Sequence, residues 1–315
     1  MKQSQFEAEN VEMCLRIENI LDGTASDQRD FPALYRRLCQ CLALCRQRGY
    51  SPALADHLQA LVSRCHRRMY GNAVERSHTL LRWMGVEFPR RVRAEWRLLL
   101  LALAAFFGVG LAVGLLVWFQ PHWAYSFASP AELATMRSMY QPGNVAIGRH
   151  GAQGDVMMFG FYIWNNTSIG FRTFAGGIFG GIPALLSVAS NGIQLGVVGA
   201  WLSKDPDTVN TFWSFVVTHS SFEVTGLLLS AVAGMRMGLA LIHPGRSGRM
   251  EALYATGREI FPVTVGAALL TVLAAFFEGF WSASTAVPAG VKYAVGALCW
   301  SAVILFFTFA GRDKR

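Results

Sequence analysis

The chain has 315 residues, of which 53% are hydrophobic and only 15% are charged. Soluble globular proteins carry about 25% charged residues, so this composition excludes a disordered chain, a disulfide scaffold and an ordinary soluble enzyme. The formal net charge is +8, and residues 1–97 hold 16 of the 28 Lys and Arg residues. A polar, basic head therefore precedes a long apolar body.

The head has the spacing of amphipathic helices. Apolar residues recur at helical intervals, which is typical of helices that each bury one face. Gly49 is suited to end a helix, and Ser51 followed by Pro52 is suited to begin the next. Several helices of this length predict a small bundle. We expect them over residues 6–21, 32–48, 52–70 and 72–84.

Five of the six cysteines lie in this head. Cys41 and Cys45 are one helical turn apart, and Cys65 directly precedes His66. A metal site is one interpretation, but the spacing matches no established zinc pattern. We expect reduced thiols in an apolar core, with no metal and no cofactor. The head cysteines are Cys14, Cys39, Cys41, Cys45 and Cys65.

A basic collar joins the head to the body. Residues 64–97 contain nine Arg against three Glu, and an apolar run over residues 98–119 follows at once. This order is typical of a cytoplasmic flank that faces anionic lipid. No nucleic-acid recognition motif accompanies the arginines, so we expect no nucleic-acid partner. The polar N-terminus predicts no cleavable signal peptide, and the first apolar run then acts as an uncleaved anchor.

The body contains several segments long enough to cross a membrane, which takes about 20 apolar residues. Residues 98–119, 261–281 and 291–310 qualify, and residues 212–242 are too long for an untilted span. The apolar stretch 156–202 is interrupted by glycine and polar residues. We expect it to form a hairpin that turns at Gly180-Gly181.

The positions of the basic residues predict the topology. The collar, the loop over residues 243–259 and the tail 311–315 are basic and therefore expected inside, whereas residues 120–155 carry only Arg137 and Arg149. An odd number of crossings must then separate residues 120 and 243. Three crossings give about six spans, which we favour, and one crossing gives four spans with a re-entrant element. The expected domains are a cytoplasmic head, 1–96, and a membrane domain, 97–315.

Ionisable side chains inside spans are costly and are candidates for function. His219 and Glu223 are four residues apart on one helix, so their side chains share a face. The polar groups either form an ion or ligand path or stabilise helix packing through hydrogen bonds, and hydrolytic catalysis is the weakest alternative. The candidates for an ion or ligand path are Asn165, Asn166, Arg172, Asn191, His219, Glu223, Arg236 and Glu278.

Pairs of glycines four residues apart recur in the body. Such pairs let helices approach closely, within a subunit or between subunits. The pairs are Gly110/Gly114, Gly176/Gly180, Gly177/Gly181, Gly192/Gly196 and Gly234/Gly238.

Several motifs of the chain form a recognisable set. Those in the body are Asn165-Asn166, Phe174 through Gly177 with Gly180, Asn191-Gly192 with Gly196, His219-Ser220-Ser221-Phe222-Glu223 and Phe277-Glu278-Gly279-Phe280. Those in the head are Leu34-Tyr35-Arg36-Arg37, Leu58 with Leu61-Val62, His66 and Met69-Tyr70. Over roughly residues 5–310 the chain resembles the stage II sporulation protein M family of bacterial and archaeal membrane proteins. It departs from the family where Thr218 replaces Pro and Ser220 replaces Gly, so the helix before Glu223 need not start where the family's does.

This resemblance implies a polytopic plasma-membrane protein. The family's namesake takes part in engulfment in spore formers, beside cell-wall hydrolases and as a membrane scaffold, but many relatives occur in bacteria that never sporulate. We therefore expect an all-α membrane protein with an N-terminal cytoplasmic helical bundle and both termini in the cytoplasm. Its expected role is a non-enzymatic scaffold in the bacterial inner membrane, homo-oligomeric, with the lipid bilayer and other membrane or envelope proteins as partners. The alternative is a transporter or channel with a polar intramembrane path.

Overall fold

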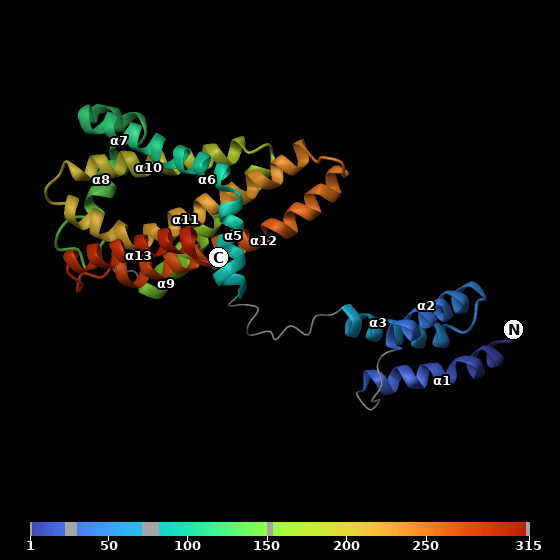
Figure 1. Ribbon diagram of the computed structural model, residues 1–315. Coiled ribbons are helices and arrows are strands. Elements are labelled where there is room, and N and C mark those ends of the chain that lie inside the picture. Colours follow the sequence, from blue (N-terminus) through green and yellow to red (C-terminus); the bar gives the residue numbers. More distant parts are fainter. Residues whose placement is uncertain (1, 23–29, 71–81, 150–153, 313–315) are drawn as a thin grey trace. The chain divides into compact units, whose positions relative to one another are not determined.

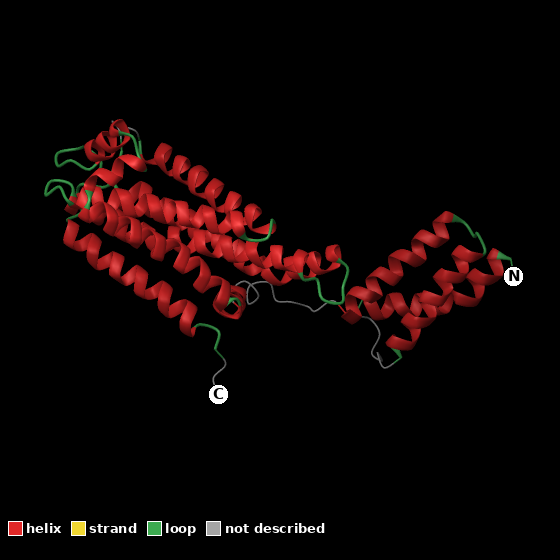
Figure 2. Ribbon diagram, turned by 90° about the horizontal axis from the view of Figure 1, so that it is seen from above, coloured by secondary structure: helices red, strands yellow, loops and turns green. Residues whose placement is uncertain are grey.

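The computed structural model describes residues 2–22, 30–70, 82–149 and 154–312. Throughout this described part, the chain forms helices joined by loops and contains no strand (Figure 2). The chain divides into two compact units, Met1–Thr79 and Leu80–Arg315. By this division residues 80–96 of the collar belong to the second unit, whereas the sequence places them in the head.

The first unit is a bundle of three helices, α1 (Gln3–Leu21), α2 (Phe31–Gln47) and α3 (Pro52–Tyr70). Each helix turns an apolar face inward, and the shared core contains Cys41, Cys45 and Cys65. Asn10 is the polar exception in this core: its amide donates to the Phe6 carbonyl at 2.8 Å and its oxygen accepts from the Cys41 thiol at 3.2 Å. The fourth helix expected over residues 72–84 falls largely outside the described residues.

The second unit is a bundle of long helices (Figure 1). Among the described residues, five helices are long and apolar enough to cross a membrane, which confirms the predicted all-α, polytopic membrane-type fold. The first of these consists of α6, η2 and α7, and another of α12 and η4. The elements are η1 (Trp83–Glu87), α5 (Phe88–Ala94), α6 (Trp96–Leu103), η2 (Ala104–Gly108), α7 (Val109–Phe119), η3 (Pro121–Ser126), α8 (Pro130–Met139), α9 (Asp155–Ile178), α10 (Ile182–Ser203), α11 (Val209–Ile242), α12 (Arg249–Phe276), η4 (Phe277–Ser282) and α13 (Ala289–Phe309).

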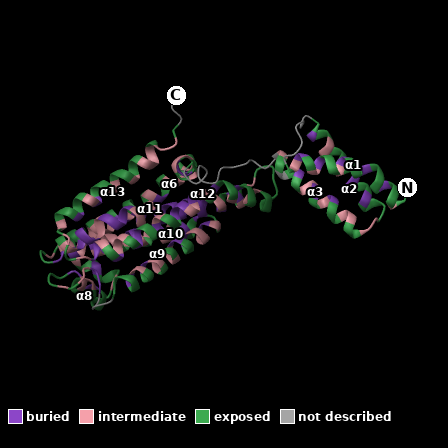
Figure 3. Cartoon of the chain, turned by 90° about the horizontal axis from the view of Figure 1, so that it is seen from below, coloured by how far each residue is buried: buried purple, intermediate pink, exposed green. Residues whose placement is uncertain are grey.

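Helix α11 is the central element of this bundle. It packs against α9, α10, α12 and α13, and its buried residues continue along most of its length (Figure 3). Side chains such as Leu228, Ala231 and Val232 lie in an apolar cluster with α6 and α10. A helix that is apolar on nearly every side is expected at such a buried position.

Helices α9 and α10 form a hairpin between α7 and α11. The chain turns at Gly180 and Gly181, whose φ angles are +77° and +85°, values that glycine adopts without steric cost. Helix α9 has 24 residues but is not one of the five apolar spans. Its polar side chains, Asn165 and Asn166 among them, distinguish it from the five.

Glycine pairs bring two helix pairs into backbone contact. Gly110 and Gly114 of α7 face Gly192 and Gly196 of α10, and a Cβ atom built on Gly110 would lie only 2.6 Å from the Gly192 carbonyl oxygen. Gly177 of α9 meets the α11 backbone in the same way, at Gly234 and Gly238. Both contacts lie within a single chain.

The collar arginines bind to the ends of the neighbouring helices. Helix α5 packs against α12 and α13. Arg93 donates to the Phe307 carbonyl at 2.9 Å, and Arg91 lies 3.9 Å from Glu259. Just beyond α5, Glu95 forms an ion pair of 2.9 Å with Arg236 of α11. Residues 91–95 of the collar are thereby bound at the end of the bundle where α11 and α13 finish.

Candidate functional site

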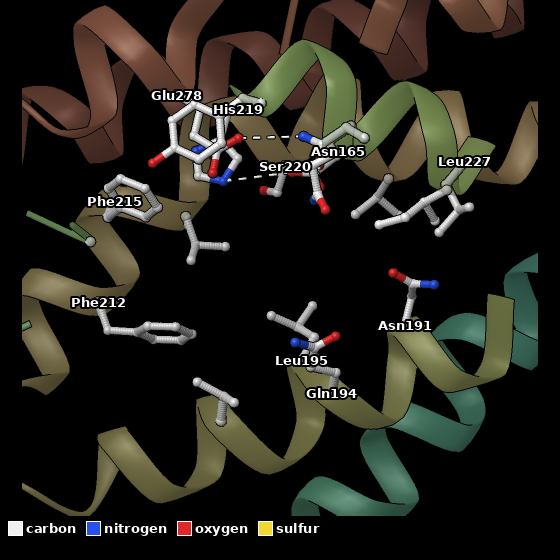
Figure 4. Close-up of a pocket in the computed structure, with 18 of the residues that line it drawn as sticks. Asn165, Asn191, Gln194, Leu195, Phe212, Phe215, His219, Ser220, Leu227 and Glu278 are labelled. Carbon is white, nitrogen blue, oxygen red and sulfur yellow. Dashed lines mark hydrogen bonds and ion pairs between the residues drawn. The ribbon is translucent and has the colours of Figure 1, made fainter. Parts of the chain in front are cut away.

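A cavity of about 340 Å³ with a mostly apolar lining and a group of polar side chains lies among α9, α10, α11 and η4 (Figure 4). Pockets of about 300–1,000 Å³ are typical of sites for small ligands. At one end the cavity is bordered by α8 and by Gly148, in the loop between α8 and α9. Six of the eight residues proposed from the sequence line it: Asn165, Asn166, Asn191, His219, Glu223 and Glu278.

One side of the cavity carries a cluster of one imidazole and two carboxyl groups. His219, Glu223 and Glu278 each present a ligand atom, and the three atoms lie within 4.8 Å of one another. The Nε2 atom of His219 is 3.7 Å from the Oε2 atom of Glu223. Figure 4 shows His219 and Glu278 together on this side, with Asn191 and Gln194 of α10 across the cavity.

The local helix geometry explains how these groups meet. His219 and Glu223 are one turn apart on α11, which is a continuous helix from Val209 to Ile242. This helix therefore begins well before Thr218 and Ser220, the two positions at which the sequence departs from the family motif. Glu278 lies on η4, a π-helical turn at the end of α12. Such turns are rare and frequently occur at functional sites.

Neighbouring polar residues fix the orientation of the cluster. The Nδ1 atom of His219 lies 3.0 Å from the Ser282 hydroxyl, so Nε2 is the ring atom left to face Glu223. The Asn166 amide donates to Glu278 at 3.4 Å, and Asn165 donates to the Asn166 oxygen at 2.9 Å. Two adjacent asparagines therefore hold one carboxylate.

Two buried cations next to the cavity were not foreseen as site residues. Lys292 is fully buried on α13 and donates to the carbonyls of Ser282 and Ser284, at 2.7 Å each. Arg149 is 4% exposed and donates to Asp155 at 2.6 Å and to the Gly279 carbonyl. Lys292 lies near the start of an apolar span. It therefore meets the criterion that selected the other candidates from the sequence, which is an ionisable side chain inside a span. Arg149 lies in a loop, where the sequence gives no sign of burial.

Tyr140 borders the cavity from the end of α8. It is buried, and its ring packs edge-on against Phe212 and Phe215 of α11. Burial, together with the nearby charge of Glu278, raises the pKa of the Tyr140 phenol above its ordinary value. The phenol is therefore a neutral hydroxyl at physiological pH.

The other two predicted residues lie elsewhere. Arg172 is exposed on the outer face of α9. Arg236 lies 13 residues beyond Glu223 on α11, which corresponds to about 20 Å of helix, and it pairs with Glu95. The structure therefore brings neither arginine to the two cavity carboxylates.

The cluster combines the donor types that divalent metals bind. Neutral imidazole and carboxylate oxygen are both common ligands of first-row transition metals. Among the described residues, the arginines of the bundle form ion pairs with acids other than Glu223 and Glu278. The one ion-pair contact that Glu223 makes there is to His219. The site thus presents two acids, one imidazole and several amides to the cavity.

The two units are similar to different families of known proteins. The family described as stage II sporulation protein M matches residues 102–283, which is more than half of the chain and includes the whole His219, Glu223 and Glu278 cluster. A second family, described as a domain of unknown function, matches residues 4–71 of the head.

A protein of Methanocaldococcus jannaschii described as uncharacterized is 29% identical over 73 residues, which is 23% of this chain and 41% of that relative. The chain therefore spans less than half the length of this relative. No solved structure matches the chain. Because the first family matches more than half of the chain and includes every residue that lines the cavity, the chain belongs to the stage II sporulation protein M family.

Proposed function

We propose that this integral membrane protein organises partner proteins at the bacterial inner membrane and has no enzymatic activity. The observation that carries the proposal is the division into two units, a helical head with its own core and a glycine-packed membrane bundle. A separate helical module next to a membrane anchor is suited to recruiting partners, since it can dock without disturbing the anchor.

The proposed orientation places both termini in the cytoplasm. The collar arginines, the loop between α11 and α12 and the C-terminal end are all basic, and basic flanks are retained on the cytoplasmic side. Counting α9 with the five apolar helices gives six crossings, which returns the C-terminus to the side of the N-terminus. The cavity end bordered by α8 then faces the extracytoplasmic side.

The proposed docking surface is the outer face of α2. Arg36, Arg37, Arg46 and Arg48 are exposed there, opposite the buried face formed by Leu38 and Cys45. A basic helical face of this kind fits an acidic surface on a partner, because charge complementarity speeds and selects association. We further propose that the chain acts as a homo-oligomer, which presents several such faces at once.

The test is charge reversal combined with crosslinking in cells. A photoreactive residue at Gln40, exposed on α2, should yield a reproducible set of crosslinked proteins from cells that express the chain at native level. The variant Arg36→Glu, Arg37→Glu should lose those crosslinks, and Arg246→Glu, in the loop between α11 and α12, should keep them. Crosslinks that persist unchanged after charge reversal would contradict the proposed docking surface.

The cavity favours a second candidate function, a transporter or channel with a polar path. However, the polar lining does not continue along α11: Ala231, Val232 and Met235 are buried in an apolar cluster beyond Leu227. Purified protein in liposomes tests this alternative, since a coupled carrier should lose flux in Glu223→Gln. Retained partner crosslinks in the same variant would support the organising role.

A further inference from the structure

We propose that His219, Glu223 and Glu278 form a binding site for a divalent transition-metal ion, open to the cavity. The inference concerns the membrane bundle alone and is independent of the organising role proposed for the head. It rests on the spacing of three donor atoms, on their charge and on the groups that orient them.

The spacing suits a shared metal ion better than a direct hydrogen bond. The Nε2 atom of His219 and the Oε2 atom of Glu223 are 3.7 Å apart, which is longer than an N–H···O bond. Two ligand atoms that each lie about 2.1 Å from a tetrahedral zinc ion are separated by about 3.4 Å. Glu278 supplies a third atom within 4.8 Å of the other two, so small side-chain rotations bring all three to coordination distance.

The charge of the cluster favours a bound cation. Two carboxylates at this depth in a membrane cost several kcal/mol unless they are paired or neutralised. The neighbouring basic groups are occupied: Arg149 binds Asp155 and Lys292 binds two carbonyls. Arg236, the basic residue of α11, pairs with Glu95. A divalent ion between Glu223 and Glu278 balances the two charges directly.

The surroundings resemble the outer shell of a metal site. A ligating histidine is usually held through its second ring nitrogen, and a ligating carboxylate through a further hydrogen bond. Here Ser282 holds the Nδ1 atom of His219, and Asn166 holds Glu278. Lys292 in turn binds the carbonyl of Ser282, so the residue that orients the imidazole is itself fixed.

The donor set also selects the class of ion. Imidazole disfavours Mg²⁺ and Ca²⁺, which prefer six or more oxygen ligands, and it suits zinc and related first-row ions. Three protein ligands leave further coordination positions, and Glu223 is partly exposed to the cavity. A site with three protein ligands and an open position binds a small anionic or neutral ligand from the cavity.

The test is zinc binding by the full-length protein in detergent, stripped of metal and purified without a polyhistidine tag. Equilibrium dialysis with metal analysis should give about one cavity-site zinc per chain. Each of His219→Ala, Glu223→Gln and Glu278→Gln should weaken that binding by at least about tenfold, because an orienting residue alone is worth about 10–100-fold. The matched control Glu251→Gln, at an exposed position early in α12, should bind zinc like the unmodified chain.

Two further measurements keep the result interpretable. The three variants retain all head cysteines, so any zinc bound by the head is the same in every variant. Zinc binding that is equal in the unmodified chain and in all three variants would overturn the proposal. Added zinc should raise the melting temperature of the unmodified chain and of Glu251→Gln but not of Glu223→Gln, as expected for a ligand that binds the folded state.

A variant that elutes as an aggregate is replaced by Asn166→Ala, which should weaken zinc binding about tenfold without removing a ligand. Binding of Mg²⁺ as tight as that of zinc would also contradict the proposed class of ion.

Discussion

The contact between α7 and α10 permits a quantitative test of the membrane bundle. Gly110→Ala adds a Cβ atom 2.6 Å from the Gly192 carbonyl oxygen, although ordinary contact begins near 3.4 Å. The two helices must therefore separate by several tenths of an ångström. Overpacking of this kind costs about 1–3 kcal/mol.

Gly108→Ala is the matched control on the same span, since a Cβ atom there meets nothing within 4 Å. Both substitutions gain the same helix propensity, about 1 kcal/mol, so the difference between them isolates the packing term. We expect Gly110→Ala to unfold at the lower temperature in detergent. Each kcal/mol corresponds to about 2–4 °C for a unit of this size. Equal melting temperatures would refute the backbone contact between α7 and α10.

Three further predictions concern the ion pair of Glu95 and the buried groups Lys292 and Cys65. Lys292→Met removes the donor to the Ser282 and Ser284 carbonyls and should lower stability by about 1–3 kcal/mol, measured by thermal unfolding against the exposed control Lys204→Met. Arg236→Gln and Glu95→Gln should show a coupling of up to about 1 kcal/mol in a double-mutant cycle, whereas Arg236→Gln and Glu223→Gln should be additive. Fragment 1–79 should be helical without zinc. Burial raises the pKa of Cys65 from 9.0 to about 11, so the unfolded chain releases the thiol proton at a lower pH than the folded chain. The free energy of unfolding of the fragment should therefore fall as pH rises from about 9 to about 11. Cys65→Ala should reduce this pH dependence in urea titrations followed by circular dichroism, and the remainder comes from Cys14, Cys41 and Cys45, whose pKa values burial also raises.

Local patterns in the sequence were enough to predict most of the helices. Helix α3 ends at Tyr70, and α11 and α13 correspond to the apolar runs expected there. The spacing of His219 and Glu223 likewise predicted a shared face. These features depend on residues within a few helical turns of one another, so the spacing of residues along the sequence is enough to predict them.

The remaining features depend on contacts between distant segments. Glu278 meets His219 only because η4 packs against α11, and nothing near either residue indicates that pairing. The sequence places Arg236 among the candidates for the same polar path, but its distance along α11 separates it from the cavity, and it pairs with Glu95. Among the three ligands proposed for the metal, His219 and Glu223 share one helix, whereas Glu278 lies more than 50 residues further along the chain, a separation that local spacing does not bridge.

The proposed orientation places the collar in the cytoplasm and the end of the cavity bordered by α8 on the extracytoplasmic side. Single cysteines at Glu9 of α1 and Ser138 of α8, both exposed, test it directly in a chain whose six native cysteines are replaced. In spheroplasts, a membrane-impermeant thiol reagent should label the cysteine at position 138 at once and the cysteine at position 9 only after the membrane is opened. Labelling of position 9 from outside, or protection of position 138 until lysis, would contradict the orientation on which the account depends.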